Sequence, residues 1–173
     1  MSVEQHAGAP VCVELPQLSR RLRPVAKAPA RIVHLGLGAF HRSHQGWYTH
    51  QASDAADWGI AAFTGRRPDA ALALAEQDGL YTIVDRADGG DSFTVVSSIV
   101  EAVDGADVQR LAELVAAPAT AVITLTITEA AYRLRADGQL DRAAPDVAAD
   151  LALLASGSGS PATPLGRLVL ALA

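Results

Sequence analysis

The sequence contains little cysteine, little lysine and no long apolar run. Cys12 is the only cysteine among 173 residues, which excludes an intrachain disulfide, a CxxC redox pair and a cysteine-rich zinc site. No apolar run reaches the roughly 18 residues that a membrane span requires, and the start MSVEQHAGAP lacks the charged-then-apolar layout of a secretory signal. The sequence therefore predicts a soluble cytoplasmic protein of about one domain.

The chain also lacks an excess of basic residues. It carries 14 Lys and Arg against 19 Asp and Glu, which gives a net charge of −5. Because no basic surplus is available to neutralise phosphates, a nucleic-acid partner is not expected. Lys27 is the only lysine, and it precedes the first expected strand.

Residues 1–30 differ in composition from the rest of the chain. They contain four prolines and the only basic cluster, which consists of Arg20, Arg21 and Arg23. We interpret this segment as an N-terminal arm laid over the surface of a domain, and the three arginines as a solvated patch.

From residue 31 onward, strand-like and helix-like segments alternate. Strands are expected at 31–38, 58–64, 81–86, 93–100 and 121–128, and helices at 43–56, 69–77, 103–117, 143–155 and 164–173. The third and fourth strands flank Asp88-Gly-Gly-Asp91 and predict a β-hairpin. The alternation predicts an α/β domain over residues 31–173 with a mainly parallel sheet and one inserted hairpin.

Gly36 and Gly38 lie between the first expected strand and the first expected helix, which Ser43 is expected to begin. In that position Gly36 permits a tight turn, and Gly38 permits close approach of the backbone to a pyrophosphate at a helix N-terminus. The third position of the GxGxxG pattern is His41, so the general pattern is incomplete. From spacing alone, dinucleotide binding and a plain strand-to-helix turn stay open as equal alternatives.

The segment 31–49 (RIVHLGLGAFHRSHQGWYT) resembles the start of the mannitol dehydrogenase family, which comprises polyol-specific long-chain dehydrogenases and hexuronate oxidoreductases. The glycine turn of that family reads GxGxFxR, and Gly36, Gly38, Phe40 and Arg42 match it, so His41 is an expected feature. Further matching blocks follow in the same order, at 58–60 (WGI), 77–82 (QDGLYT) and 124–129 (TLTITE) with Tyr132.

The resemblance implies a Rossmann-type NAD-binding domain that works with a second, mostly helical substrate domain. The implied reaction is metal-free, reversible hydride transfer between the nicotinamide and a sugar alcohol or sugar acid, such as mannitol with fructose or mannonate with fructuronate. The family uses a downstream lysine as general acid/base, and Lys27 matches no such motif. We therefore expect the cofactor-binding part of an enzyme, without catalytic residues of its own. A free-standing nucleotide-binding or interaction module without turnover is the alternative.

The resemblance also implies which residues bind the cofactor. Backbone groups of the turn are expected to meet the pyrophosphate, and these are Gly36, Leu37, Gly38, Ala39 and Phe40. Arg42 would add a charge-assisted contact. Thr126, Thr128 and Glu129 fall at the carboxyl end of a late strand and are expected at the nicotinamide end. For the two threonines, simple strand propensity is the alternative.

The choice of nucleotide depends on the end of the second expected strand, which reads Thr64-Gly-Arg-Arg-Pro-Asp69. Asp69 is a candidate partner for the ribose hydroxyls of NAD, whereas Arg66 and Arg67 could instead pair with the 2′-phosphate of NADP. Because the family uses mainly NAD, we expect NAD, with NADP as the alternative.

We also expect particular surroundings for three histidines and for one apolar helix face. His41 and His44 are three residues apart, but no third or fourth ligand lies nearby in sequence, so no metal site is expected. His34 is expected as a hydrogen-bonded core residue of the first strand. One helix face carries Leu165, Leu168, Val169 and Leu172, and we expect the absent substrate domain, or self-association, to cover it.

Overall fold

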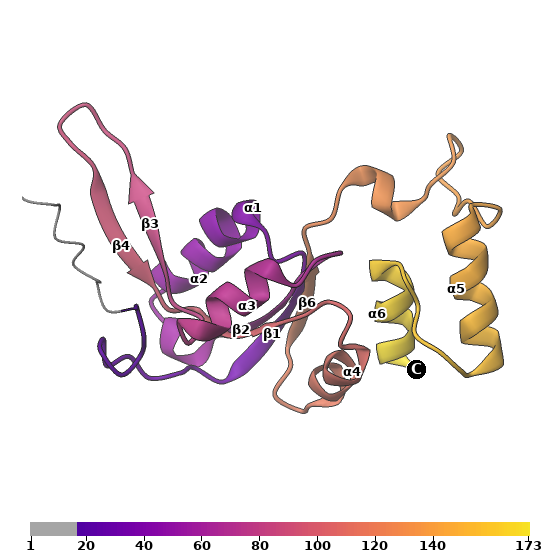
Figure 1. Ribbon diagram of the computed structural model, residues 1–173, viewed down its shortest axis with the longest axis horizontal. Coiled ribbons are helices and arrows are strands. Elements are labelled where there is room, and N and C mark those ends of the chain that lie inside the picture. Colours follow the sequence, from indigo (N-terminus) through magenta and orange to yellow (C-terminus); the bar gives the residue numbers. More distant parts are fainter. Residues whose placement is uncertain (1–16) are drawn as a thin grey trace, which may run out of the picture.

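The computed structural model describes residues 17–173, so Cys12 and residues 1–16 of the expected arm lie outside the described residues. A four-stranded parallel sheet with the order β5-β2-β1-β6 forms the centre (Figure 1). Its strands are β1 (Ala30–Leu35), β2 (Gly59–Phe63), β5 (Ile99–Val103) and β6 (Val122–Leu125). The predicted α/β domain with a mainly parallel sheet is confirmed, and the strand order is the one that begins a Rossmann fold.

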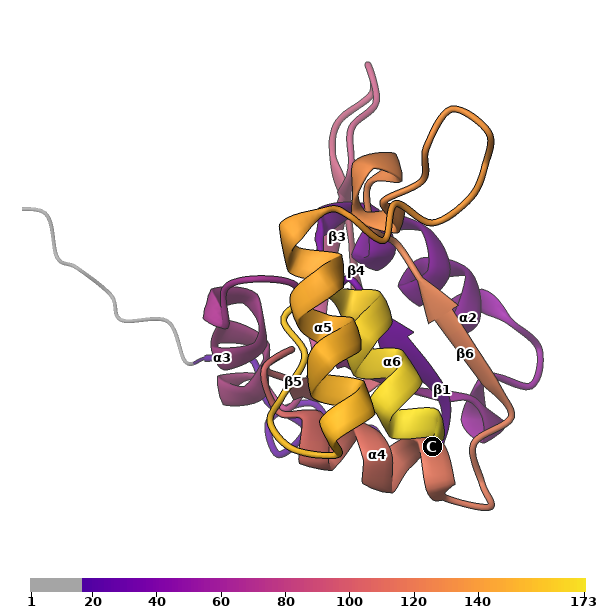
Figure 2. The same cartoon turned by 90° about the vertical axis from the view of Figure 1, so that its right-hand side faces the viewer.

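Helices cover both faces of the sheet. They are α1 (Ala39–His41), α2 (Trp47–Gln51), α3 (Asp69–Glu76), α4 (Val108–Ala116), α5 (Pro145–Ser156) and α6 (Pro164–Leu172). Because side chains alternate along a strand, Ile60 of β2 packs on the side of α3, whereas Phe63 packs on the side of α4 and α6. α5 lies outside α6 and forms the outermost layer at this end of the molecule (Figure 2). Among residues 17–173, no helix combines the length and the apolar character that crossing a membrane demands.

The predicted hairpin is present, but its second strand is shorter than expected. β3 (Tyr81–Asp85) and β4 (Ser92–Val96) pair antiparallel and project from the body of the domain (Figure 1). The single strand expected at 93–100 is wrong, because the chain turns at Ser97 and Ser98 and continues as β5 beside β2. The Ser98 carbonyl accepts from the Ile60 amide at 2.8 Å, and its hydroxyl donates to the Gly46 carbonyl at 2.7 Å. These two bonds direct the chain from the hairpin into the main sheet.

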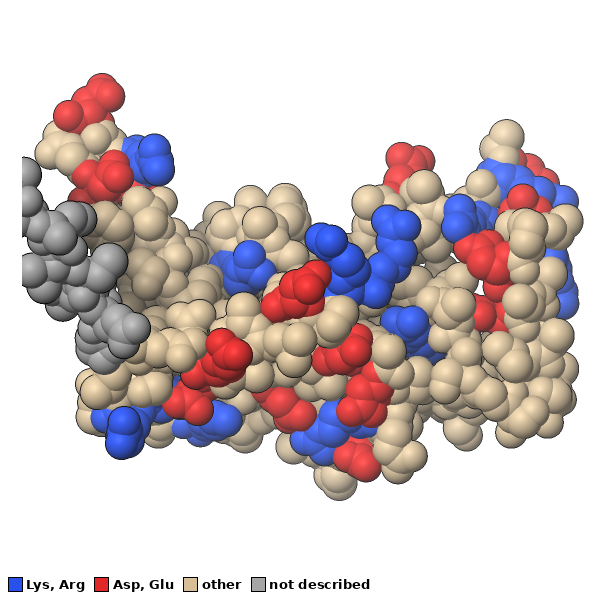
Figure 3. All heavy atoms as spheres, in the orientation of Figure 1, with Lys and Arg blue, Asp and Glu red and all other residues tan. Residues whose placement is uncertain are grey.

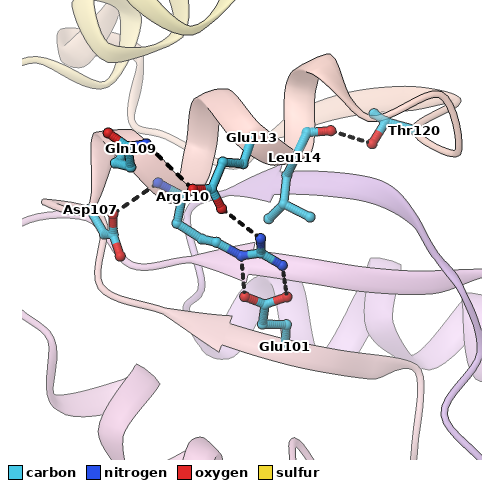
Figure 4. Close-up of polar contacts among 7 residues, drawn as sticks. All are labelled: Glu101, Asp107, Gln109, Arg110, Glu113, Leu114 and Thr120. Carbon is cyan, nitrogen blue, oxygen red and sulfur yellow. Dashed lines mark hydrogen bonds and ion pairs between the residues drawn. The ribbon is translucent and has the colours of Figure 1, made fainter.

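The α4 helix begins later than the sequence predicted, since Val103 still belongs to β5. Asp107 caps the helix by accepting a hydrogen bond from the Arg110 amide at 2.9 Å. The Arg110 guanidinium then contacts both carboxylate oxygens of Glu101, at 2.7 and 2.9 Å, and Glu113 at 2.8 Å (Figure 4). At the other end the Thr120 hydroxyl donates to the Leu114 carbonyl at 2.6 Å. The contact between Arg110 and Glu101 fixes α4 against β5, while the other bonds hold the two ends of the helix.

The described part of the N-terminal segment is attached to the domain through Arg20. Its guanidinium donates to the carbonyls of Ser97 at 2.7 Å and Ile99 at 3.1 Å, and also to those of Val25, Ala26 and Asp78. The side chain is half-buried, and burial lowers the pKa of its guanidinium. The interpretation of the arginine cluster as a solvated patch is therefore wrong for Arg20.

Candidate functional site

The glycine turn that follows β1 is held by β2 and by the segment after β6. The amides of Gly36 and Leu37 both donate to the Phe63 carbonyl, at 2.9 and 2.8 Å. Gly36 has a φ of +120°, and a Cβ added there would lie 2.4 Å from the Thr126 carbonyl oxygen. Only glycine fits this position, because both the backbone conformation and the space exclude a side chain.

Gly38 is glycine for a different reason. Its backbone is extended, with φ of −127°, and an added Cβ would meet only the Gly36 carbonyl oxygen, at 3.7 Å. The protein itself therefore does not require glycine here. The helical segment begins immediately afterwards at Ala39 rather than near Ser43 as predicted. Among the described residues, no group accepts a hydrogen bond from the amides of Gly38, Ala39 and Phe40, which leaves three backbone donors free.

The helix after the turn is irregular, which the sequence did not predict. A π-helical segment, Arg42–Gly46, separates α1 from α2, and the helix ends at Gln51 instead of residue 56. The Tyr81 hydroxyl donates to the Arg42 carbonyl at 2.7 Å, while Ser98 binds the Gly46 carbonyl. Burial raises the pKa of Tyr81, so its hydroxyl keeps the proton that it donates. Side chains from the hairpin and from the start of β5 thus fix the widened turn, a feature frequent at functional sites.

Each histidine of this region stacks on another ring. His34 is fully buried in β1, and its ring nitrogens lie 2.7 Å from Thr124 Oγ1 and 2.9 Å from Thr126 Oγ1, which confirms the expected hydrogen-bonded core residue. His41 stacks on His34 with ring centroids 3.6 Å apart, whereas His44 stacks on Phe40 at 4.0 Å. His41 and His44 therefore have different partners. Within residues 17–173, no group of three or more side chains is arranged to hold a metal ion.

A cleft of about 670 Å³ opens where β1, β2 and β6 end. Four of the expected site residues line it, namely Gly36, Arg66, Thr126 and Thr128. The others lie outside its lining, namely Leu37, Gly38, Ala39, Phe40, Arg42, Asp69 and Glu129. Basic side chains gather around the hollow between α3 and the α5–α6 end of the molecule (Figure 3). The cleft lies at the carboxyl ends of the strands, where ligands bind in open α/β sheets.

β6 ends at Leu125, so the strand expected at 121–128 is too long. Thr126 and Thr128 consequently belong to the segment that leaves the sheet edge and borders the cleft. The Thr126 hydroxyl donates to the Gly36 carbonyl at 2.8 Å and therefore stabilises the turn itself. Thr128 and Glu129 are exposed at the start of a 3-10 turn, Glu129–Tyr132.

Asp69 begins α3 and does not line the cleft. Asp69 pairs with Arg67 at 3.3 Å, and both side chains are largely exposed. Arg66 lines the cleft and forms no ion pair with any described residue. The Arg42 guanidinium likewise has no ion pair within the described part of the chain.

Two further arginines of the cleft were missed by sequence reasoning. Arg167 of α6 donates to the Gly105 carbonyl at 2.6 Å and joins the helix to the loop after β5. Arg133 has a left-handed backbone with φ of +52° and forms an ion pair with Asp146 of α5. No local signal marks these residues, since they come from segments that meet the glycine turn only in the folded domain.

Lys27 lies far from this cleft. It lines a smaller hollow of about 290 Å³ together with His50 and Ser98. That hollow lies where β1, β2 and β5 begin, whereas the large cleft lies where strands end. The only lysine of the chain is therefore at the opposite edge of the sheet.

Residues 30–158 match the family model described as the mannitol dehydrogenase Rossmann domain. D-mannonate oxidoreductase of Escherichia coli (strain K12) is 34% identical over 157 positions that cover 85% of this chain and 31% of that protein. Mannitol 2-dehydrogenase of Cereibacter sphaeroides is 35% identical over 147 positions that cover 82% of this chain and 30% of that protein. The chain spans about a third of the length of these curated relatives.

Among solved structures, D-sorbitol dehydrogenase in substrate-free form is similar to this domain. The TM-score is 0.75 at 26% sequence identity, and the match covers 91% of this chain and 36% of that chain. The likeness therefore extends over most of the chain.

Proposed function

Because the chain belongs to the mannitol dehydrogenase family, we propose that it is the cofactor-binding part of an NAD-dependent oxidoreductase of sugar alcohols or sugar acids. The nicotinamide, when bound, accepts or supplies the hydride. The residues of this chain bind and orient the dinucleotide. The substrates in view are mannitol with fructose and mannonate with fructuronate, in keeping with the names of the relatives.

The observation that carries the proposal is the pair of glycines with different surroundings. Gly36 is required by the fold, but Gly38 leaves open space beside three free amides at the start of a helix. Free amides at a helix start favour a pyrophosphate, and an open glycine lets the phosphate oxygens approach the backbone. We assign this role to the amides of Gly38, Ala39 and Phe40, with Arg42 as the charged contact. The amides of Gly36 and Leu37 are already bonded to Phe63.

Two residues bear on the choice of nucleotide. The family uses mainly NAD, which favours NAD here. Asp69 is only a weak candidate for binding the ribose hydroxyls of NAD, because its carboxylate is paired with Arg67. Arg66 lines the cleft without an ion pair, which favours a 2′-phosphate and hence NADP as the second candidate. We expect Thr128 and Glu129, after β6, at the nicotinamide end.

We expect no turnover from this chain alone, because of the position of Lys27. A lysine that serves as general acid/base must reach the reacting oxygen, and Lys27 lies at the opposite edge of the sheet. We therefore propose that the catalytic groups belong to a second domain of the enzyme. A nucleotide-binding module without turnover is the alternative, and a search of the DNA beyond Ala173 for a lysine-asparagine-histidine block distinguishes the two.

The exposed apolar residues of α6 support a covering partner. Leu168 packs in the core of this domain, whereas Val169 and Leu172 are 53% and 62% exposed. We propose that the substrate domain covers these two side chains. Left bare, they favour self-association, which sedimentation velocity would detect as a concentration-dependent rise in mass.

Calorimetric titration of the chain with NADH and NADPH tests the proposal. We expect saturable binding of at least one nucleotide, with NADH the tighter if Asp69 meets the ribose and NADPH if Arg66 meets a phosphate. A parallel assay with mannitol or mannonate and NAD is expected to show negligible turnover. Absence of binding by the folded chain would refute the proposal, and ordinary dehydrogenase rates would refute the assignment of catalysis to another domain.

A further inference from the structure

A chain of hydrogen bonds runs through β1 and β6 to the glycine turn. The Thr126 hydroxyl donates to the Gly36 carbonyl at 2.8 Å, and its oxygen lies 2.9 Å from His34 Nε2. The other ring nitrogen, Nδ1, lies 2.7 Å from the Thr124 hydroxyl. Since a threonine hydroxyl has one hydrogen, these contacts restrict the protonation of the ring.

One tautomer of His34 satisfies every group in this chain. If Nε2 carries the hydrogen, it donates to Thr126, the Thr126 hydroxyl donates to Gly36, and the Thr124 hydroxyl donates to Nδ1. If Nδ1 carries the hydrogen, Thr126 must donate to Nε2, and the Gly36 carbonyl loses the only hydrogen-bond donor that it has among the described residues. The first arrangement is favoured because only in it does the half-buried Gly36 carbonyl keep its protein donor.

The surroundings of His34 keep the ring neutral and dry. Its side chain is fully buried, and His41 covers one face of the ring. Burial lowers the pKa of His34 to about 4, so the ring is neutral at neutral pH.

The backbone around Gly36 is thereby fixed by three hydrogen bonds to two partners. The amides of Gly36 and Leu37 donate to Phe63 of β2, and the Gly36 carbonyl accepts from Thr126. The next residue is Gly38, the first of the three free amides. The direction of those amides depends on a peptide that His34 orients through Thr126.

We propose that His34 is a positioning residue for nucleotide binding, because as the Nε2–H tautomer it holds the Thr126 hydroxyl on Gly36 and so sets the free amides of the turn. The inference rests on the proposed function for its ligand. It adds a buried residue outside the cleft to the binding machinery. His34 acts through Thr126 and does not touch the nucleotide.

Two threonine variants and a matched control test the inference. Thr126→Val removes the hydroxyl, whereas Thr126→Ser keeps it. Thr120→Val is the control, because Thr120 also donates to a backbone carbonyl, that of Leu114, but lies at the end of α4. We expect Thr126→Val to weaken NADH binding about tenfold, as the loss of one orienting hydrogen bond would. Thr126→Ser and Thr120→Val are expected to bind NADH like the wild type, although Thr120→Val loses a bond of the same kind.

A spectroscopic measurement on the nucleotide-free protein tests the protonation of the His34 ring directly. Nitrogen-15 spectra of the imidazole are expected to show protonated Nε2 and unprotonated Nδ1 for His34 in the wild type and in Thr126→Ser. A proton on Nδ1 in the wild type, or wild-type NADH affinity in a folded Thr126→Val, would overturn the inference. If Thr126→Val does not fold, the test of the inference rests on the tautomer of His34 and on the NADH affinity of Thr126→Ser. Wild-type protein that shows the expected tautomer but binds no nucleotide would instead overturn the proposed function.

Discussion

The ring of His41 lies on the ring of His34, with centroids 3.6 Å apart and an angle of 13° between the planes. Both residues are fully buried, and neither nitrogen of His41 has a hydrogen-bond partner within the described part of the chain. Burial, together with the neighbouring His34, lowers the pKa of His41 to about 3, and burial lowers that of His34 to about 4. We therefore expect this pair to make the folded domain less stable in acid.

The direction of the pH dependence follows from these values. In the unfolded chain both histidines take up protons near their ordinary pKa of 6.5, whereas the folded protein binds them only near pH 4 and below. Their contribution is fully present above pH 6.5 and is lost as the pH falls toward 4. At about 1.4 kcal/mol per pKa unit, His34 alone is expected to reduce the free energy of unfolding by about 3 kcal/mol over that range.

The variant His41→Phe keeps a stacked ring and removes two nitrogens that have no partner. We expect it to equal or exceed the wild type in stability at pH 7, because an unpaired buried polar group is costly. Between pH 6.5 and 4 its stability should fall less steeply than that of the wild type. Urea unfolding at several pH values measures this, with the exposed stacked residue His44 changed to Phe as the control. An unchanged pH dependence in His41→Phe would contradict the prediction.

Much of the fold could be predicted from the sequence, because it depends on local signals. The apolar runs at β1 and β2, the Gly-Gly hairpin turn, and Pro164 at the first position of α6 all act over a few residues. The family resemblance is confirmed in the same way, since its glycine turn is a contiguous motif.

The errors came where tertiary contacts decide the local structure. The bend at Ser98 depends on its bonds to Gly46 and Ile60, and the π-helical segment depends on Tyr81, which lies 39 positions away from Arg42. Arg133 and Arg167 reach the cleft only because α5 and α6 fold back toward the ends of the strands. Such contacts leave no periodic or compositional trace in the chain.

A second prediction concerns the buried carboxylate of Asp150, which connects α5 to the start of α6. Its oxygens accept from the Ala162 amide at 2.7 Å and from the amide and hydroxyl of Thr163 at 2.9 and 2.6 Å. Asp150→Asn places an amide group against one of these donors, so we expect a loss of about 2 to 3 kcal/mol in the free energy of unfolding. Asp146→Asn breaks an exposed ion pair with Arg133 and should cost much less than the loss at Asp150. Equal losses for the two variants in urea would refute this account of Asp150.

A third prediction concerns the attachment of the N-terminal segment. Arg20→Lys keeps the charge but loses the planar fork that reaches five backbone carbonyls. We expect residues 17–29 to detach locally, which limited proteolysis would report as faster cleavage there than in the wild type. The exposed neighbour Arg21, changed to Lys, provides the matched control. Cleavage of Arg20→Lys at the wild-type rate would show that other contacts hold the segment.

The last prediction separates binding from folding at the glycine turn. Gly38→Val adds a side chain where the nearest atom beyond the adjoining residues is 3.7 Å from the new Cβ, so the variant is expected to fold with nearly wild-type stability. The same side chain would stand between the free amides and a pyrophosphate, and NADH affinity should fall at least about tenfold. Gly89→Val, in the open hairpin turn with no atom within 4 Å of the new Cβ, is the control and should bind like the wild type. Gly36→Ala, by contrast, should unfold more readily whether or not nucleotide is present, because its Cβ would lie 2.4 Å from the Thr126 carbonyl oxygen. If Gly38→Val is folded and binds NADH normally, the turn is structural only and the pyrophosphate must lie elsewhere.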